Sequence, residues 1–304
     1  MSGKSPNNRT LTVSRDEYSS LDNYIVNTYE PNKIINGDLF DIIGDIPDKT
    51  FDLIIIDPPY NLSKDFGSNS FKKMSDKEYE EWLESWVPEV TKKMKDNGSL
   101  YMCGDWKCSC EMKRVLEKEL MILNRITWQR EKGRGSKTNW KNGMEDIWFA
   151  VKDLNNYKFN PDAVKMRRRV LAPYKQDGKP KDWNETESGN FRDTYASNFW
   201  DDISIPFWSM PENTDHPTQK PEKLIAKLML ASSDEGDMVF DPFLGSGTTA
   251  VVAEKLGRNW SGIEKNREYC YWSAKRLMKA ESDKTIQGYS DGIFWERNTA
   301  IKKK

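Results

Sequence analysis

The sequence predicts an α/β fold: a doubly wound, mostly parallel sheet that is covered by helices on both faces and carries an inserted, loop-rich region. Strand-like and helix-like segments alternate along most of the 304 residues, which is typical of such a sheet. Residues 51–56 form a nearly continuous apolar run, the pattern of a strand buried on both faces. A glycine-rich turn after residues 238–240 leads into a helix-like segment, as expected at the carboxyl end of a parallel strand.

The first half of the chain contains most of the expected strands, after a polar and weakly patterned segment at residues 1–30. Ser75 is a suitable helix N-cap and Glu78 completes a capping box, whereas Pro88 in the same segment predicts a kink or a break. Asn97-Gly98 predicts a turn before the next strand. The strands expected here are residues 33–38, 51–56, 99–103, 122–129 and 145–151, and the helices are residues 39–46, 75–95 and 111–120.

The second half begins with a long irregular stretch. Residues 153–213 are rich in polar and aromatic residues without a sustained period, so we expect an inserted, loop-rich region there. Residues 281–304 form a polar tail that we expect to be flexible, which places the main domain at residues 31–280. The remaining expected elements are helices at residues 221–232, 248–256 and 268–280 and strands at residues 238–240 and 260–263.

Composition narrows the class of protein. No stretch approaches the roughly 20 apolar residues that span a bilayer, and the first ten residues lack an apolar signal region, so we expect a cytoplasmic protein. The chain has one histidine and four cysteines, and the spacing of Cys103, Cys108 and Cys110 does not match zinc-binding pairs. We therefore expect reduced thiols and no bound metal.

The net charge of −1 hides an uneven distribution of charge. Basic residues gather at residues 125–141 and again at residues 165–181, whereas acidic residues gather at residues 76–89 and 234–237. A basic face on a neutral protein is sufficient to follow the phosphates of a nucleic acid. The same pattern is also typical of a solvated surface loop, and charge alone does not decide between the two.

Asp57-Pro58-Pro59-Tyr60 follows the first buried strand directly. Two prolines fix the backbone and remove two N–H donors, which leaves carbonyl groups free to point into a cavity. The Asp57 carboxylate and the Pro58 carbonyl could accept both hydrogens of a planar amine whose ring stacks on Tyr60. Alone, the motif is equally consistent with a simple turn at the end of a strand.

A second polar motif, Asp241-Pro242-Phe243-Leu244-Gly245-Ser246-Gly247-Thr248-Thr249, follows the strand at residues 238–240. Its glycines permit positive φ and close approach of a ligand, but the spacing is that of neither a dinucleotide-binding nor a phosphate-binding loop. Glu264 ends the next expected strand, where a carboxylate can accept both hydroxyls of a ribose. The expected ligand is a nucleoside without a polyphosphate, and S-adenosylmethionine fits this description. Because ligands of open α/β sheets bind outside the carboxyl ends of strands, we expect the two motifs to share one crevice and the protein to join two substrates.

Residues 30–280 resemble the amino-methyltransferases that modify DNA bases. The chain is similar to the permuted group, the β class, in which the catalytic Asp-Pro-Pro-Tyr half precedes the cofactor half. Asp57 to Tyr60 match the catalytic motif, Asp241 to Gly247 match the cofactor motif, and His216 to Pro221 match the segment that this class places before the cofactor half. The resemblance implies a Rossmann-like, S-adenosylmethionine-dependent methyltransferase fold.

The resemblance also implies roles for individual residues. Asp57 and the Pro58 carbonyl would hold the target amine, Tyr60 would stack on the flipped base, and Pro59 completes the catalytic motif. His216 would be structural or lie beside the cofactor rather than act as a general base. Lys220 and Thr218 would approach the methionine carboxylate of the cofactor, and Glu264 would bind its ribose. The full set of expected cofactor residues is Asp38, Thr218, Lys220, Asp241, Phe243, Gly245, Gly247, Thr248 and Glu264.

DNA is the partner that the resemblance implies, and adenine N6 is the favoured target because the motif begins with Asp rather than Ser. Cytosine N4 as the target, or a catalytically idle nucleic-acid-binding subunit, remains open. A homodimer through aromatic-rich helices around Trp82, Trp86 and Trp272 is also open, against burial of these residues in one subunit. The expected DNA contacts are Arg130, Arg134, Lys137, Arg167, Arg168 and Arg169.

Overall fold

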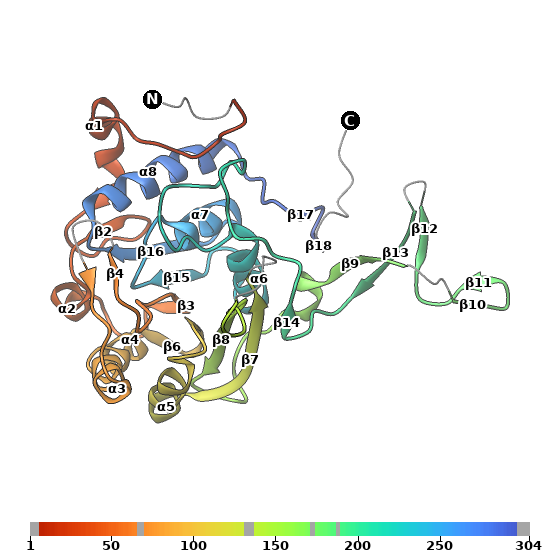
Figure 1. The fold of residues 1–304 in the computed structure, drawn as a ribbon, viewed down its shortest axis with the longest axis horizontal. Helices are drawn as coiled ribbons and strands as arrows, with labels where there is room; N and C mark the ends of the chain where they lie inside the picture. The colour runs from red at the N-terminus through yellow and green to blue at the C-terminus, as the bar shows by residue number, and fades with distance from the viewer. Residues whose placement is uncertain (1–5, 66–69, 131–136, 171–173, 187–188, 297–304) are drawn as a thin grey trace.

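The computed structural model describes residues 6–65, 70–130, 137–170, 174–186 and 189–296. Its centre is a nine-stranded sheet in which only β8 runs antiparallel to its neighbours (Figure 1). The expected mostly parallel sheet is therefore confirmed. The strands, in order across the sheet, are β1 (Ile25–Val26), β2 (Ile34–Asn36), β16 (Asn259–Glu264), β15 (Met238–Asp241), β3 (Phe51–Ile56), β6 (Met94–Gly104), β8 (Met144–Val151), β7 (Met121–Gln129) and β14 (Phe199–Trp200).

Helices cover both faces of this sheet, and this arrangement explains why the sequence of β3 is almost continuously apolar. Leu53 and Ile55 belong to the core beneath the helices α6 to α8, whereas Ile54 and Ile56 belong to the core beneath α2 to α5. Neither face of β3 reaches solvent. The helices are α2 (Leu39–Ile42), α3 (Asp76–Glu84), α4 (Val87–Lys92), α5 (Ser109–Glu119), α6 (Glu222–Ser232), α7 (Thr248–Lys255) and α8 (Arg267–Ser282).

The expected helix at residues 75–95 is two helices. The capping box is confirmed, because Ser75 Oγ accepts from the Glu78 N–H and the Glu78 carboxylate accepts from the Ser75 N–H. The helix is interrupted at Ser85 and Trp86. Pro88 lies in the first turn of α4, where a backbone N–H has no partner within the helix, so the missing N–H of proline does not destabilise it. The turn expected at Asn97-Gly98 was wrong as a strand boundary: β6 runs through it with a register shift.

The segment before residue 31 has more structure than its sequence predicts. It contributes the edge strand β1, and Tyr18 stacks on Tyr271 of α8 with ring centroids 3.8 Å apart. The short helices of the described chain that lie outside the main layers are η1 (Arg15–Glu17), α1 (Tyr18–Leu21), η2 (Asp22–Tyr24), η3 (Ile43–Asp45) and η4 (Pro161–Val164).

The irregular stretch at residues 153–213 contains strands that form a second sheet with the end of the chain. Figure 1 shows this sheet and a distal hairpin extending away from the main body. Phe294 is fully buried and β18 pairs with β9, so the expectation of a flexible polar tail is wrong for residues 289–295. Hydrophobic side chains there are few but well placed, and sequence composition does not reveal them. The order in the second sheet is β12 (Asn184–Thr186), β13 (Gly189–Thr194), β9 (Met166–Arg169), β18 (Ile293–Trp295) and β17 (Tyr289–Ser290); the two hairpins are β10 (Lys175–Gln176) with β11 (Lys179–Pro180), and β4 (Lys64–Asp65) with β5 (Ser70–Phe71).

Membrane-spanning helices and metal clusters are both absent from the residues that the structure describes. None of their helices has the length and apolar character needed to cross a bilayer. No group of three or more His, Cys, Asp or Glu side chains among them could hold a metal ion. All four cysteines are free thiols, and Cys110 alone among them is exposed.

Candidate functional site

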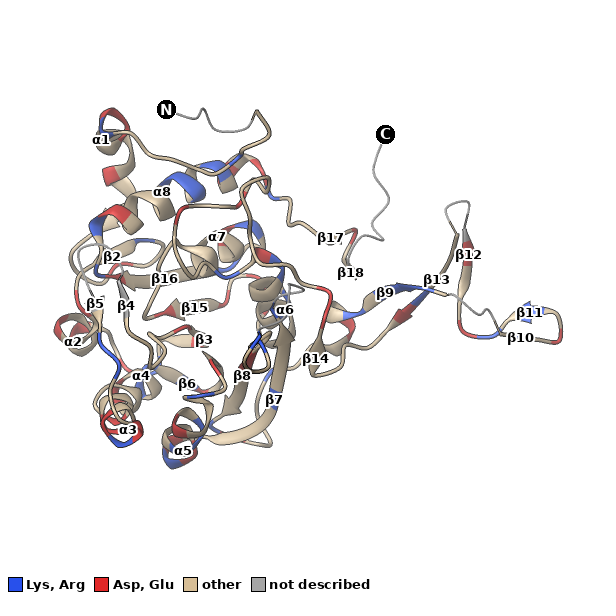
Figure 2. Ribbon diagram, in the orientation of Figure 1, with Lys and Arg blue, Asp and Glu red and all other residues tan. Residues whose placement is uncertain are grey.

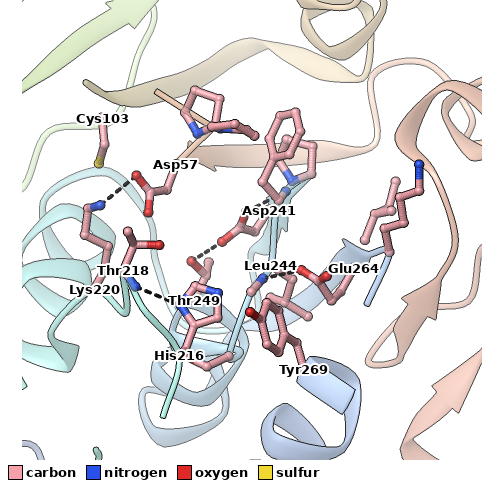
Figure 3. Close-up of a pocket in the computed structure, with 18 of the residues that line it drawn as sticks. Asp57, Cys103, His216, Thr218, Lys220, Asp241, Leu244, Thr249, Glu264 and Tyr269 are labelled. Atoms are coloured by element: carbon pink, nitrogen blue, oxygen red, sulfur yellow. Dashed lines mark hydrogen bonds and ion pairs between the residues drawn. The ribbon is translucent and has the colours of Figure 1, made fainter. Parts of the chain in front are cut away.

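The two polar motifs lie at one edge of the sheet because their strands are neighbours. β15 pairs in parallel with β3, with Val239 opposite Leu53 and Phe240 opposite Ile54. Asp57 and Asp241 therefore emerge side by side and line one cavity of about 540 Å³ (Figure 3). The expectation that the motifs share a crevice is confirmed.

One end of the cavity holds a compact network of charges around Asp57. Lys220 Nζ donates to Asp57 Oδ1 at 2.6 Å, and the Tyr60 hydroxyl donates to the same oxygen at 2.8 Å. Lys220 Nζ also lies 3.2 Å from Glu145 Oε2 and 5.2 Å from the centroid of the Tyr60 ring. Lys220 is expected at the methionine carboxylate of the cofactor, but its ammonium group instead pairs with the proposed amine acceptor.

The network fixes the protonation of its members. Burial lowers the pKa of Lys220, but the charges of Asp57 and Glu145 outweigh burial and raise that pKa above its ordinary value. Burial and the same two carboxylates raise the pKa of the Tyr60 hydroxyl well above its ordinary value. Lys220 is thus an ammonium ion and Tyr60 a neutral phenol at physiological pH.

The proline pair is only partly free to face a ligand. The Tyr79 hydroxyl of α3 donates to the Pro59 carbonyl at 2.9 Å, so this carbonyl points into the protein rather than into the cavity. The expectation of free carbonyl groups is therefore wrong for Pro59. Both prolines line the cavity, and Pro58 remains the residue assigned to the second amine hydrogen.

The start of the second motif is held by hydrogen bonds from its own turn. Asp241 accepts from the Phe243 N–H at 3.0 Å and from the Thr249 hydroxyl at 2.6 Å. Burial raises the pKa of Asp241 to about 7, against the effect of these two donors. Phe243 packs edge-on against Trp86 with ring centroids 5.0 Å apart, which fixes the apolar wall of the cavity.

The two glycines of the motif have different roles. Gly245 has φ of +56° and lines the cavity, and a Cβ there would lie 3.1 Å from the His216 ring. Gly247 has φ of +82°, and a Cβ there would lie 2.6 Å from the Ser273 side chain. Gly247 is absent from the cavity wall and instead lets α7 begin close to α8, so its expected contact with a cofactor has no support from the geometry.

Two carboxylates occupy the other end of the cavity. Glu264 accepts from the backbone N–H groups of Gly245 at 2.8 Å and Asn266 at 2.6 Å. Burial raises the pKa of Glu264 to about 7, although these two N–H donors oppose the shift. Asp38 caps α2 through the Phe40 N–H and pairs with Lys265 at 2.7 Å. Figure 3 places Glu264 and Tyr269 at the end of the cavity opposite Asp57 and Lys220.

The segment before α6 borders the same cavity. The His216 ring packs edge-on against Tyr269, with centroids 4.5 Å apart, and His216 Nδ1 accepts from the Thr218 N–H at 3.3 Å. The Thr248 hydroxyl donates to the Lys220 carbonyl at 3.0 Å, so it ties α7 to this segment. Thr218, Lys220 and Thr248 all line the cavity.

Glu145 is the member of the network that sequence reasoning missed. It stands at the start of β8 and is 4% exposed. Because β8 is antiparallel to β6, its first residues lie at the same edge as the carboxyl ends of the parallel strands. An apolar run does not reveal the direction of its strand. The sequence therefore gave no sign that Glu145 and Asp146, which precede residues 147–151, lie at the same edge as the two motifs.

The residues expected to contact DNA divide into several groups. Arg130 lines the cavity and pairs with Glu145 at 2.8 Å. Arg167 forms a bidentate pair with Asp193, and Arg168 pairs with Glu296 at 3.2 Å. Lys137 and Arg169 are exposed, whereas Arg134 lies outside the described residues. Figure 2 shows positions of acidic and basic residues alternating along the ribbon from β9 to β13.

The aromatic helices do not form an exposed apolar patch. Trp86 is 1% exposed, and Trp82 packs against Phe71 with centroids 5.3 Å apart. Trp272 stacks on Tyr269 within the same subunit. Trp86 belongs to the core, and Trp82 and Trp272 are partly buried against aromatic neighbours of the same chain, so these residues give no separate argument for a dimer.

The mostly parallel sheet, with helices on both faces and a cavity at its carboxyl edge, is the architecture of Rossmann-like methyltransferases. A family model described as DNA methylase, covering the adenine-N6 and cytosine-N4 enzymes, matches residues 51–276. The chain belongs to this N6/N4 family of DNA methylases.

Known relatives agree with this assignment. The chain is 33% identical over 273 residues to DNA adenine methyltransferase YhdJ of Escherichia coli, covering 84% of this chain and 90% of that protein. It is 31% identical over 247 residues to the type II methyltransferase M.HpaI of Haemophilus parainfluenzae, covering 81% and 74% respectively. The crystal structure of the M1.HpyAVI-SAM complex matches with a TM-score of 0.57 and 26% identity, over 80% of this chain and 98% of that one. The cytosine-N4-specific PvuII DNA methyltransferase, at 20% identity and a TM-score of 0.57, shows the shared fold alone.

Proposed function

We propose that this chain is a site-specific DNA methyltransferase that transfers a methyl group from S-adenosylmethionine to the N6 amine of a flipped adenine. One observation carries the proposal: a single cavity has the Asp57 carboxylate and Tyr60 at one end and the Gly245 turn with Glu264 at the other. An amine acceptor and a ribose acceptor are thus joined by continuous space of about 540 Å³, a volume typical of small-molecule sites.

The cofactor end suits a nucleoside. Glu264 accepts the ribose hydroxyls, and Asp38 lies beside the adenine of the cofactor. Phe243 supplies an apolar wall, and the absence of a side chain at Gly245 leaves room beside the His216 ring. S-adenosylmethionine supplies a methyl group that is already activated on a sulfonium.

At the other end, the residues orient the target amine for attack. The Asp57 carboxylate and the Pro58 carbonyl accept the two hydrogens of N6, while Tyr60 stacks on the flipped base. The N6 lone pair forms the new bond to carbon as the bond from that carbon to sulfur breaks, so the sulfonium leaves as the neutral thioether S-adenosylhomocysteine. The methylated N6 then releases its extra proton to solvent. Asp57 stabilises the positive charge that develops on nitrogen, and orientation of the two reactants supplies much of the rate.

The order of the motifs supports assignment to the β class, because Asp57 to Tyr60 precede His216 to Pro221 and the glycine turn. Residues 153–213 are then the target-recognition region, with residues 31–280 as the methyltransferase domain. Of the residues assigned to DNA, Arg169 lies in this region and is exposed, whereas Arg130, which lines the cavity, and Lys137, which is exposed, precede it in the chain.

Mass spectrometry of nucleosides tests the product directly. Purified protein, unmethylated DNA and S-adenosylmethionine should yield N6-methyladenine without added divalent metal. N4-methylcytosine as the only product would overturn the base assignment and keep the mechanism. A chain that binds DNA but transfers no methyl group would overturn the enzymatic proposal in favour of an idle subunit.

A further inference from the structure

Glu145 is a buried carboxylate that contacts the catalytic network without lining the cavity. Glu145 Oε1 accepts from Arg130 at 2.8 Å. Glu145 Oε2 lies 3.2 Å from Lys220 Nζ and 3.2 Å from the Tyr60 hydroxyl oxygen, whose hydrogen has its shorter contact with Asp57. Its described contacts with the site are therefore with Arg130, Lys220 and Tyr60, and its effect on catalysis is expected to pass through them.

The charges around Asp57 explain why such a residue is needed. The Lys220 ammonium lies 2.6 Å from Asp57 and by itself would neutralise the carboxylate that faces the target amine. Glu145 adds a second negative charge on the other side of Lys220, so the buried trio keeps a net charge of −1. Arg130 balances this charge formally, but its side chain is 37% exposed and solvent screens it more strongly.

We propose that Glu145 is a positioning residue for methyl transfer that acts through Lys220, an inference that rests on the proposed function. Glu145 draws the ammonium between two carboxylates, and it retains Lys220 when the target amine takes its place on Asp57 Oδ1. Asp57 then still carries an uncompensated negative charge when N6 becomes positive. Without Glu145, two cations would compete for one carboxylate during the transfer.

Other groups around Lys220 do not replace Glu145. The Cys103 thiol of β6 lines the same end of the cavity, and burial raises its pKa well above the ordinary value, so it stays neutral. Asp241 of β15 is engaged by Thr249 and the Phe243 N–H. Within the described residues that face Lys220, Asp57 and Glu145 are the two carboxylates within ion-pair distance.

A double-mutant cycle tests the proposal with Glu145→Gln, Lys220→Met and the pair combined. Glu145→Gln should slow single-turnover methyl transfer by about 10- to 100-fold, with the dissociation constant for S-adenosylmethionine within about twofold of wild type. Adding Lys220→Met to Glu145→Gln removes the competing cation and should raise the rate at least about fivefold above Glu145→Gln alone. Lys220→Met alone leaves two adjacent carboxylates, and the acidic limb of its pH–rate profile should move to higher pH.

Asp146→Asn is the matched control, because Asp146 is the next residue of β8, is 6% exposed and bonds to Ser109 and Thr127 instead. Its transfer rate should stay near that of wild type, and thermal denaturation checks that all variants fold. The proposal is overturned if Glu145→Gln transfers methyl groups within about twofold of wild type. The proposal is also overturned if the fold-decrease in transfer rate of the double variant equals the product of the fold-decreases of the two single variants. A merely structural role of Glu145 predicts that result.

A second readout separates this proposal from the proposed function. The cycle is scored on whichever exocyclic amine the wild-type protein methylates, so N4-methylcytosine would leave it readable. If the wild type transfers no methyl group, competitive acetylation of Lys220 with acetic anhydride across pH still applies. Glu145→Gln should lower the apparent pKa of Lys220, and an unchanged labelling profile would overturn the inference.

Discussion

The backbone N–H of Gly245 donates to Glu264 Oε2 across 2.8 Å, which fastens the glycine turn after β15 to the carboxylate that ends β16. The two features that sequence analysis assigns separately to the cofactor are thus one unit. A change in the turn moves the carboxylate, and loss of the carboxylate frees the turn. The amine end of the cavity has its own hydrogen bonds, so the two ends can be tested separately.

Gly245→Val should abolish measurable binding of S-adenosylmethionine. The position has φ of +56°, and a Cβ would press to 3.1 Å from the His216 ring, so the β-branched side chain strains the turn and narrows the cavity. Isothermal calorimetry should show affinity reduced more than about 10-fold, which is more than about 1.4 kcal/mol. Unchanged affinity would remove the turn from the cofactor site.

Asp57→Ala should have the opposite profile. The carboxylate is assigned to the target amine, so single-turnover methyl transfer should fall by about 10²- to 10³-fold. Affinity for S-adenosylmethionine should change little, because Glu264 and the glycine turn lie at the other end of the cavity. Equal loss of cofactor binding in Asp57→Ala and Gly245→Val would contradict this division of roles.

Glu264 should make the cofactor-free protein less stable as the pH rises. Burial raises its pKa to about 7 in the folded chain, so the folded state holds a proton that the unfolded state releases near pH 4.5. The resulting stability is complete below pH 4.5 and is lost as the pH rises through 7. Between pH 5 and pH 8, urea denaturation should show wild type losing about 1 to 3 kcal/mol relative to Glu264→Gln. If the free energy of unfolding changed equally with pH in wild type and Glu264→Gln, titration of Glu264 would be excluded as the cause.

Affinity for S-adenosylmethionine should rise over the same interval. The ionised carboxylate accepts the ribose hydroxyls better than the protonated form does, so the dissociation constant should fall from pH 6 to pH 8. Glu264→Gln should bind more weakly and lose most of this pH dependence. Calorimetry at several pH values measures both effects, and a pH-dependent affinity that survives the substitution would point to Asp241 instead, whose pKa burial also raises to about 7.

The arginines of β9 should differ in their contribution to DNA binding, because one is exposed and another is paired with an acidic residue. Arg169 is exposed, and Arg169→Ala should reduce the slope of log affinity for DNA against log salt by up to about 0.9 without loss of stability. Arg167 is held by Asp193 at 2.7 Å and lies 5.3 Å from the Trp295 ring centroid, so Arg167→Ala should mainly destabilise the second sheet. A salt slope unchanged in Arg169→Ala would make this residue part of a solvated surface only.

The end of the chain should contribute strongly to stability. Phe294 is fully buried against Tyr289, with ring centroids 4.5 Å apart, and belongs to the core beneath α6. Phe294→Ala should lower the free energy of unfolding by about 3 to 5 kcal/mol in chemical denaturation. Trp140→Ala is a suitable comparison, since Trp140 is 95% exposed and its loss should cost less than about 0.5 kcal/mol.

The sequence by itself determined the alternating scaffold and the two motifs. The short, isoleucine-rich run at residues 51–56 favoured a strand with two buried faces, and the proline pair of Asp-Pro-Pro-Tyr marked where that strand ends. Local rules were sufficient for the Ser75 cap, the break near Pro88 and the glycine turn, because each depends on residues a few positions apart.

The tertiary structure decided what depends on distant partners. The contact of Lys220 with Asp57 joins residues 163 positions apart, and the place of Glu145 depends on β8 running antiparallel to β6. The ion pair of Arg167 and the strand structure of residues 289–295 likewise depend on the pairing of β9 with β13 and β18. Distant neighbours that the fold brings together decide whether a charged side chain is paired and whether a polar segment forms a strand. No local pattern in the sequence encodes these neighbours.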